Sequence, residues 1–239
     1  MKIIVLSSSD YKETDKIYSA ITEDGYISFT VRGARSAKSK FIWLNNPLTI
    51  ADIELNNDGR YKYQYLLDAK PLYSPLSNKD SPFYLFFISV ITDVIQHMFQ
   101  DDEKHKMFND VIGALTALKS EKDPYTVALI FIAKAMKVAG LELEVNKCVY
   151  CGTTHDIVAF SFADGGFVCR NCHKDGTPRD LSPEQMRLMR YVSLSPDYSC
   201  RGSERYDDSD KKFLLSAFQN YIANVLGVNL DTINFIINY

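Results

Sequence analysis

Four cysteines of this chain have the spacing of metal ligands, in two pairs of the form Cys-x-x-Cys. They are Cys148, Cys151, Cys169 and Cys172. Each pair places two thiolates on one tight turn, and two such turns fill every position of a tetrahedral site. Because no position is left open for water, the spacing predicts one structural zinc ion and no hydrolytic centre. The alternatives are a thioredoxin-like redox pair, which needs only one such motif in a βαβ context, and inert thiols.

The segment between the two cysteine pairs predicts a zinc ribbon at about residues 145–180. Residues 157–162 and 167–168 are short apolar runs, and Gly165-Gly166 marks a turn between them. Two short strands joined by a turn, with a cysteine pair on either side, are typical of this module.

Other potential ligands carry weaker signals. His155 and His173 are close to the cysteines in sequence, but four sulfurs already satisfy the metal, so we expect these histidines around the site or at the surface. Cys200 stands alone in a polar stretch, and we interpret it as a reduced thiol without a role.

A second pattern is electrostatic. No acidic residue occurs from residue 25 to residue 51, and four cations fall within nine positions: Arg32, Arg35, Lys38 and Lys40. Small residues between these cations would let a phosphate backbone approach the main chain, and a mixture of Arg and Lys suits contact independent of sequence. The segment is a candidate strand-binding edge. The alternative is a solvated loop whose charges balance Asp52 and Glu54.

Aromatic residues near this segment have two interpretations. Tyr61, Tyr63 and Tyr65 alternate on one face of a predicted strand. Such a row could stack on bases, because every base offers a π-face, but it more often packs against a neighbouring domain. The sequence favours packing, and Trp43 has the same two interpretations.

The elements that must position these residues begin with β structure. Strands are expected at residues 3–6, 16–22, 26–31, 48–55 and 60–69, with turn residues such as Asp24-Gly25 between them. Five short strands in this length are typical of an oligonucleotide-binding (OB) fold. We therefore predict an OB-fold DNA-binding domain at residues 1–78.

From residue 79 onward, the hydrophobic period becomes helical. Ser81-Pro82 resembles an N-cap followed by Pro at the first helical position, with a helix through residue 99. Further helices are expected at residues 104–118, 124–139, 183–194 and 208–226. The predicted fold class is α+β: a five-stranded OB-fold β-barrel, then an all-α domain at residues 79–239 that carries the four-cysteine zinc ribbon.

Composition limits the classes of function. With 46% hydrophobic and 24% charged residues, the chain can bury an ordinary core. A net charge of -3 means that affinity for nucleic acid must come from a local basic patch. The first residues lack a signal-peptide pattern and polar residues interrupt the most apolar stretch, 83–99, so we expect a cytoplasmic protein without membrane contact. No catalytic triad or phosphate-binding glycine loop is visible, so we do not expect an enzyme.

Segments in both halves of the chain resemble, in the same order, the RecO family of bacterial DNA repair proteins. In the predicted barrel, the segments are 11–17, 22–25, 32–36 and 38–39. In the predicted helical domain, they are Cys148-x-x-Cys151-Gly152, Phe160, Gly165-Gly166, Cys169-x-x-Cys172, Leu226-Gly227 and Phe235-Ile236. Together these landmarks span the whole chain.

The resemblance implies a nucleoid-associated recombination mediator that performs no covalent chemistry. Such a protein binds single- and double-stranded DNA, anneals complementary strands and, with RecR, loads RecA onto DNA coated by single-strand-binding protein (SSB). It makes the four cations at residues 32–40 the DNA-contacting loop. The family's helical domain also receives the acidic, phenylalanine-ended tail of SSB, for which Lys134 and Lys137 are the candidates here.

Two rival functions remain open. In one, the chain is a protein-interaction adaptor whose barrel and ribbon bind other proteins, while its basic loop is only solvated. In the other, it is a zinc-ribbon subunit of an enzyme. Titration of DNA at two salt concentrations separates the mediator from the adaptor, because only phosphate contacts give a steep salt dependence.

Overall fold

A computed structural model of the chain describes residues 1–56, 64–75, 82–120, 122–173 and 179–238. The chain divides into two compact units, Met1–Leu115 and Thr116–Tyr239. The division falls inside helix α2 (Phe108–Lys119), and the first unit holds the N-terminal β structure together with helix α1 (Pro82–Met98). The boundary at residues 78–79 marks where the sequence changes from strand to helix pattern, and it stays a prediction.

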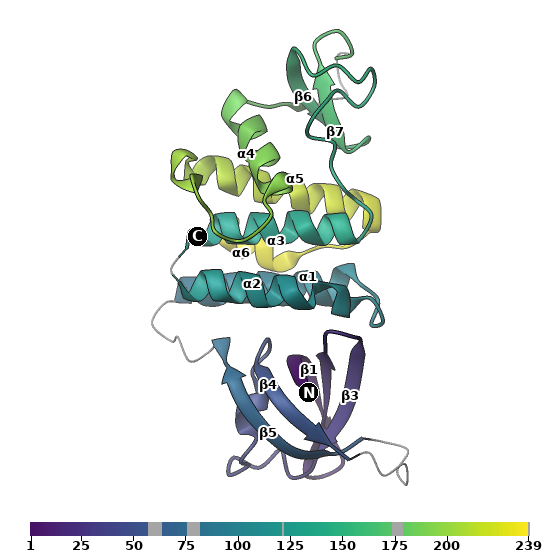
Figure 1. Ribbon diagram of the computed structural model, residues 1–239, viewed down its shortest axis with the longest axis vertical. Coiled ribbons are helices and arrows are strands. Elements are labelled where there is room, and N and C mark those ends of the chain that lie inside the picture. Colours follow the sequence, from purple (N-terminus) through teal and green to yellow (C-terminus); the bar gives the residue numbers. More distant parts are fainter. Residues whose placement is uncertain (57–63, 76–81, 121, 174–178, 239) are drawn as a thin grey trace. The chain divides into compact units, whose positions relative to one another are not determined.

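The first unit contains the predicted five-stranded barrel (Figure 1). Its strands, in the sheet order β3-β2-β1-β4-β5, are β1 (Lys2–Tyr11), β2 (Asp15–Ile21), β3 (Tyr26–Val31), β4 (Ile50–Leu55) and β5 (Leu66–Tyr73). Neighbouring strands are antiparallel, and a parallel bridge between Thr30 and Tyr65 joins β3 to the start of β5. This contact closes the sheet on itself, which confirms the OB-fold barrel.

Alternating apolar residues explain the core of this barrel. In β3, Phe29 and Val31 are buried, as the alternating pattern predicts, and the ring of Phe29 stacks on Tyr18 of β2 at 5.8 Å between centroids. The Asp24-Gly25 turn closes the β2–β3 hairpin, where the Thr22 amide donates to the Gly25 carbonyl at 2.8 Å. In the strand β4, period-two alternation likewise buries Ala51, Ile53 and Leu55 in the core.

Two strands differ by more than two residues from their predicted bounds. β1 continues through a polar stretch to Tyr11, which pairs with Asp15, because backbone pairing needs no apolar side chain. β5 begins at Leu66 and continues through Pro71, so the prediction for 60–69 was wrong about where this strand ends. The strand can contain a proline because β5 is the last strand in the sheet order, where the missing amide leaves no neighbouring strand unpaired. Tyr61 and Tyr63 lie outside the described residues.

The predicted helices of the second unit are confirmed and begin at the predicted residues. They are α3 (Pro124–Val138), α4 (Pro183–Leu194) and α5 (Asp208–Leu226), followed by a short closing helix, α6 (Asp231–Asn238). Ser182 and Gln185 form a capping box at α4, and Gly227 ends α5 in the left-handed conformation. Ser81, the cap predicted for α1, lies outside the described residues.

In the part of the chain that the structure describes, no helix is long and apolar enough to span a membrane.

A partly buried ion pair joins two of these helices. Asp123 caps α3 by accepting from the Thr126 amide at 3.2 Å, and its carboxylate also lies 2.8 Å from the buried ammonium of Lys211 on α5. Burial raises the pKa of Asp123, but hydrogen bonds from Lys211 and Thr126 outweigh burial and hold this pKa below its usual range. The cap therefore also fixes the packing of α3 on α5.

A three-stranded ribbon projects from the second unit (Figure 1). Its strand order is β7-β6-β8, with β6 (Ile157–Ser161), β7 (Gly166–Cys169) and β8 (Arg179–Asp180). The first two strands were predicted, whereas β8 has only two residues and carries no readable alternation. These strands position the cysteine pairs.

Candidate metal centre and nucleic-acid interface

The two cysteine pairs form two turns that share one backbone hydrogen bond. In the first, the Gly152 amide donates to the Cys148 carbonyl at 2.9 Å. In the second, the His173 amide donates to the Cys169 carbonyl at 2.9 Å, so His173 occupies the position equivalent to Gly152. The left-handed conformation of Gly152 lets the chain leave the first turn. The repeated geometry shows why the spacing Cys-x-x-Cys presents two sulfurs from one turn.

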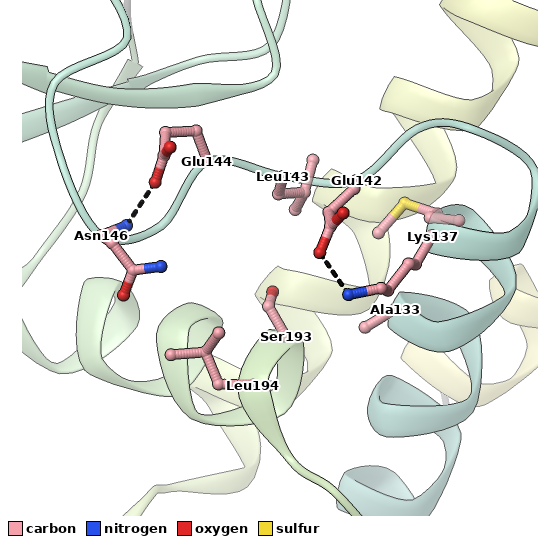
Figure 2. A pocket seen from close by; sticks show the side chains of 9 residues that line it. Ala133, Lys137, Glu142, Leu143, Glu144, Asn146, Ser193 and Leu194 are labelled. Carbon is pink, nitrogen blue, oxygen red and sulfur yellow. Dashed lines mark hydrogen bonds and ion pairs between the residues drawn. The ribbon is translucent and has the colours of Figure 1, made fainter. Parts of the chain in front are cut away.

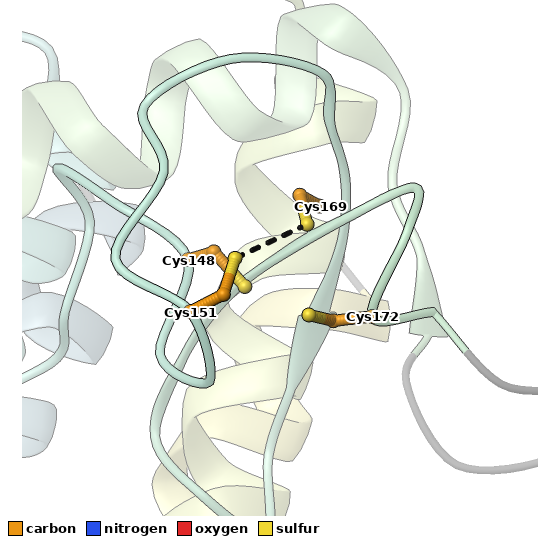
Figure 3. A group of neighbouring side chains, drawn as sticks. All are labelled: Cys148, Cys151, Cys169 and Cys172. Atoms are coloured by element: carbon orange, nitrogen blue, oxygen red, sulfur yellow. Dashed lines mark hydrogen bonds between the residues drawn. The ribbon is translucent and has the colours of Figure 1, made fainter.

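The four sulfur atoms converge on one point (Figure 3). All lie within 4.8 Å of one another, and the Sγ atoms of Cys151 and Cys169 are 3.6 Å apart. A tetrahedron with Zn–S bonds of about 2.3 Å has sulfurs separated by about 3.8 Å. The cysteines are not joined as disulfides. The donor set can therefore hold a metal ion and fits the closed tetrahedral geometry of zinc.

The protein environment favours the thiolate at one of these positions. Burial raises the pKa of Cys148, but hydrogen bonds from the backbone amides of Cys169, Cys151 and Tyr150 outweigh burial and lower this pKa to about 6. A thiolate, not a thiol, is the metal ligand. The turns therefore supply donors that stabilise a ligating sulfur.

Two glycines allow the ribbon to pack closely. A Cβ at Gly166 would lie 3.0 Å from the Cβ of Val149, inside the first cysteine turn. At Gly165, which has φ of +66°, a Cβ would lie 2.7 Å from the hydroxyl of Tyr221 on α5. The ring of Phe162 lies 6.2 Å from that of Tyr221. The predicted turn therefore also seats the ribbon on α5.

The other candidate ligands lie outside this sulfur cluster. Among the residues that the structure describes, the cluster contains neither His155 nor His173. Cys200 is buried elsewhere, where its thiol donates to the Tyr198 carbonyl and burial raises its pKa to about 11. A thiol with such a pKa stays protonated at neutral pH and is a poor nucleophile.

The basic segment follows β3 and is fastened to the barrel. The side chains of all four predicted cations are exposed, whereas Ala34 between them is buried in the barrel core. The Gly33 amide donates to the Asp15 carboxylate at 3.0 Å, and the Arg35 amide donates to the Thr14 carbonyl at 3.0 Å. The segment is thus an ordered loop with cationic side chains pointing outward.

The four cations differ in how they are held. The guanidinium of Arg35 lies 3.3 Å from Asp10 and donates to the Lys12 carbonyl, so it ties the loop to the β1–β2 turn. Lys40 lies 3.5 Å from Asp68, and both of these side chains are about 70% exposed. Such a pair contributes little and can open to a competing phosphate. The sequence pattern did not reveal these acidic neighbours, because they lie on other strands.

Arg32 has an aromatic neighbour. Its guanidinium lies over the ring of Tyr65, 4.4 Å from the centroid. Tyr65 therefore has a contact within the barrel unit, and its packing against a neighbouring domain stays a prediction. Trp43 packs partly against the barrel core and donates from its indole nitrogen to the Lys40 carbonyl at 3.0 Å.

The two lysines predicted for peptide binding lie on α3 but face different surroundings. Lys137 lines a pocket of about 370 Å³ and pairs with Glu142 at 2.5 Å (Figure 2). Lys134 does not line this pocket and donates to the Pro196 carbonyl at 3.1 Å. The apolar lining is Ala133, Met136, Leu143 and Leu194.

Ser193 and Leu194, at the end of α4, complete the pocket, and sequence reasoning missed both. The buried hydroxyl of Ser193 has no hydrogen-bond partner within the described part of the chain. Glu142 and Glu144 also line the pocket, so its charged side chains are one ammonium and two carboxylates. The pocket therefore combines an apolar lining with one cation, Lys137, that is paired with Glu142.

Comparisons with known proteins cover both halves of the chain. A family model described as "Recombination protein O C terminal" matches residues 80–232, and one described as "Recombination protein O N terminal" matches residues 1–75. The DNA repair protein RecO of Bacillus subtilis is 25% identical over 98% of this chain and 91% of its own length. That of Bacillus pumilus is 25% identical over 97% and 91%, and that of Shouchella clausii is 29% identical over 98% and 91%.

Proposed function

This chain belongs to the RecO family and has a role in DNA repair and recombination, and from that premise we propose that it is a recombination mediator that binds DNA strands without catalysis. The proposed activities are binding of single- and double-stranded DNA, annealing of complementary strands and, with RecR, loading of RecA onto SSB-coated DNA. Binding to DNA would associate the protein with the nucleoid.

The observation that carries this proposal is the ordered basic loop on the barrel. Four exposed cationic side chains extend from this loop, and hydrogen bonds to Asp15 and Thr14 fix its backbone. Binding of a strand therefore requires little further ordering of the loop. Lys38 and Lys40 contribute point charges that suit phosphate contact, and Arg32 can also stack. These contacts read no base edges, which fits a mediator that must act on any sequence.

We propose that the four clustered cysteines hold one Zn²⁺ ion as a structural cofactor. A ribbon of this size cannot bury enough apolar surface to fold alone, so the metal supplies stability that its small core lacks. Elemental analysis should find near-stoichiometric zinc in the purified protein. A metal-free protein whose residues 145–180 resist protease would contradict this role.

We also propose that the pocket beside α3 receives the acidic tail of SSB. Its apolar lining suits a terminal phenylalanine, while Lys137 can contact the terminal carboxylate. Of the two predicted lysines, Lys137 is the better placed. K137E should weaken binding of a tail peptide and leave binding of naked DNA unchanged, and K134E is the control at the same helix end.

The DNA-binding proposal is tested by changing the loop as a whole. The variant R32A/R35A/K38A/K40A should lose affinity similarly for all DNA sequences, measured by fluorescence anisotropy at two or more salt concentrations. For a single strand, removal of each phosphate-binding side chain should reduce the log–log salt slope by roughly 0.7, or about 3 if all four contact phosphate. A control with the same change of charge removes two Lys and two Arg elsewhere: K106A/K122A/R187A/R201A.

The two variants separate the mediator from its rivals. A loop variant that keeps its affinity and its salt slope would refute the DNA-binding role of the loop. Absence of DNA binding by the unchanged protein would favour the protein-interaction adaptor. Equal losses in the loop variant and the control would show that only overall charge matters.

A further inference from the structure

Closure of the barrel brings Arg32 and Tyr65 together. Arg32 directly follows β3, and Tyr65 directly precedes β5. The Thr30 amide donates to the Gln64 carbonyl at 2.9 Å, and Thr30 bridges to Tyr65. The same strand contact therefore fixes the backbone of both segments and holds Arg32 beside Tyr65.

The pair has the geometry of a cation–π contact. At 4.4 Å from the ring centroid, the guanidinium is well within the distance of about 6 Å at which such contacts are attractive. The backbone next to Arg32 is held as well, because the amide of Gly33 donates to the Asp15 carboxylate. Arg32 therefore loses part of its rotamer freedom before any ligand arrives.

The guanidinium differs from a lysine ammonium in having two flat faces. The guanidinium lies over the Tyr65 ring, yet Arg32 as a whole is exposed and lies at the start of the basic loop. A planar guanidinium can stack on an aromatic ring and on a nucleobase, and each base stacked in this way contributes about 1–3 kcal/mol. A base in a duplex is already stacked on its neighbours, so only an unpaired base is available to such a platform.

We propose that Arg32 and Tyr65 form a stacking platform for one unpaired base, so that the same site that binds DNA phosphates also favours single strands over duplex. This inference rests on the proposed DNA-binding function. It assigns different tasks to the cations of the loop: Lys38 and Lys40 attract the phosphates of any strand, and Arg32 distinguishes unpaired from paired DNA.

The decisive variant is R32K, which keeps the charge and removes the flat guanidinium. Y65L removes the ring, Y65F keeps it as the matched control, and K38A removes a nearby charge that is outside the platform. Anisotropy gives the dissociation constants for a labelled single strand and for a duplex of equal length. A 2-aminopurine base in the single strand reports stacking through quenching of its fluorescence.

We expect R32K and Y65L to weaken single-strand binding about tenfold or more, to change duplex binding less than about twofold and to reduce the quenching. R32K should keep the salt slope, and Y65F should resemble the unchanged protein. K38A should weaken both DNAs alike and reduce the salt slope by about 0.7.

Failure of the platform and failure of DNA binding give different results. If K38A weakens both DNAs while R32K binds the single strand and quenches 2-aminopurine as the unchanged protein does, the platform is wrong and the phosphate-binding loop stands. If R32K weakens both DNAs equally, Arg32 is a phosphate contact and the platform is again wrong. If the unchanged protein binds neither DNA, both proposals fail. R32K leaves the ring in place, so the test does not depend on the folding of Y65L.

Discussion

The contact between the ribbon turn and α5 allows a sharp test of how the ribbon is seated. Gly165 has a left-handed backbone, and a Cβ added there would lie 2.7 Å from the Tyr221 hydroxyl but 3.6 Å from the Cζ atom behind it. G165A therefore has two separate costs. The left-handed conformation costs an alanine about 1–2 kcal/mol, and overpacking against the hydroxyl adds about 1–3 kcal/mol.

The second cost should vanish when the hydroxyl is removed. In a Y221F background, the nearest atom of that ring is at ordinary contact distance, so G165A should cost only about 1–2 kcal/mol. The four proteins form a double-mutant cycle with an expected coupling of about 1–3 kcal/mol. Gly140 is the matched control, because its φ is +79° and, among the described residues other than its chain neighbours, no atom lies within 4 Å of an added Cβ. G140A should therefore cost the same in both backgrounds.

Urea unfolding followed by far-ultraviolet circular dichroism measures these free energies, and hydrogen exchange at β6 and β7 localises the effect. The zinc content of each variant shows whether the cysteine cluster survives. Equal costs of G165A in the two backgrounds would refute the seating of the ribbon on Tyr221.

Three further predictions concern the ion pair, the peptide pocket and the cysteines. The folded pKa of Asp123 lies below its ordinary value of 3.8, so its pairing with Lys211 contributes stability that is present above about pH 4 and is lost as the pH falls through the folded pKa. D123N keeps a capping side chain, and urea unfolding should show a loss of about 1–3 kcal/mol at pH 7 with a shallower acid decline. E142Q should release Lys137 from its ion pair and raise the affinity for an acidic, phenylalanine-ended peptide up to about fivefold, as measured by calorimetry. Weaker binding would exclude Lys137 as the cation that receives the peptide. C148S should lose the metal by elemental analysis and C200S should keep it, whereas loss in both would connect Cys200 with the site.

Sequence alone predicted the features that depend on neighbours along the chain. A helix cap such as Asp123 before Pro124, or a turn such as Asp24-Gly25, acts within a few residues, so its signal is local. The Cys-x-x-Cys pairs are local in the same sense, because two sulfurs come from one turn. Alternation of apolar residues is also a local signal, and it predicted the strands of the barrel. It did not predict the polar half of β1, where only backbone pairing defines the strand.

Tertiary structure decided which of these local features meet. Arg32 lies over Tyr65 because β3 and β5 close the barrel, and no pattern in either segment indicates that contact. Topology likewise places Gly165 against Tyr221, and Lys137 in the same pocket as Ser193. The physical reason is that periodicity and turn chemistry fix the backbone over a few residues, whereas contacts between distant residues depend on how whole strands and helices pack. The sequence therefore predicted the fold, the sulfur cluster and the basic loop, and the packed structure determined which side chains stand beside each cation of the loop.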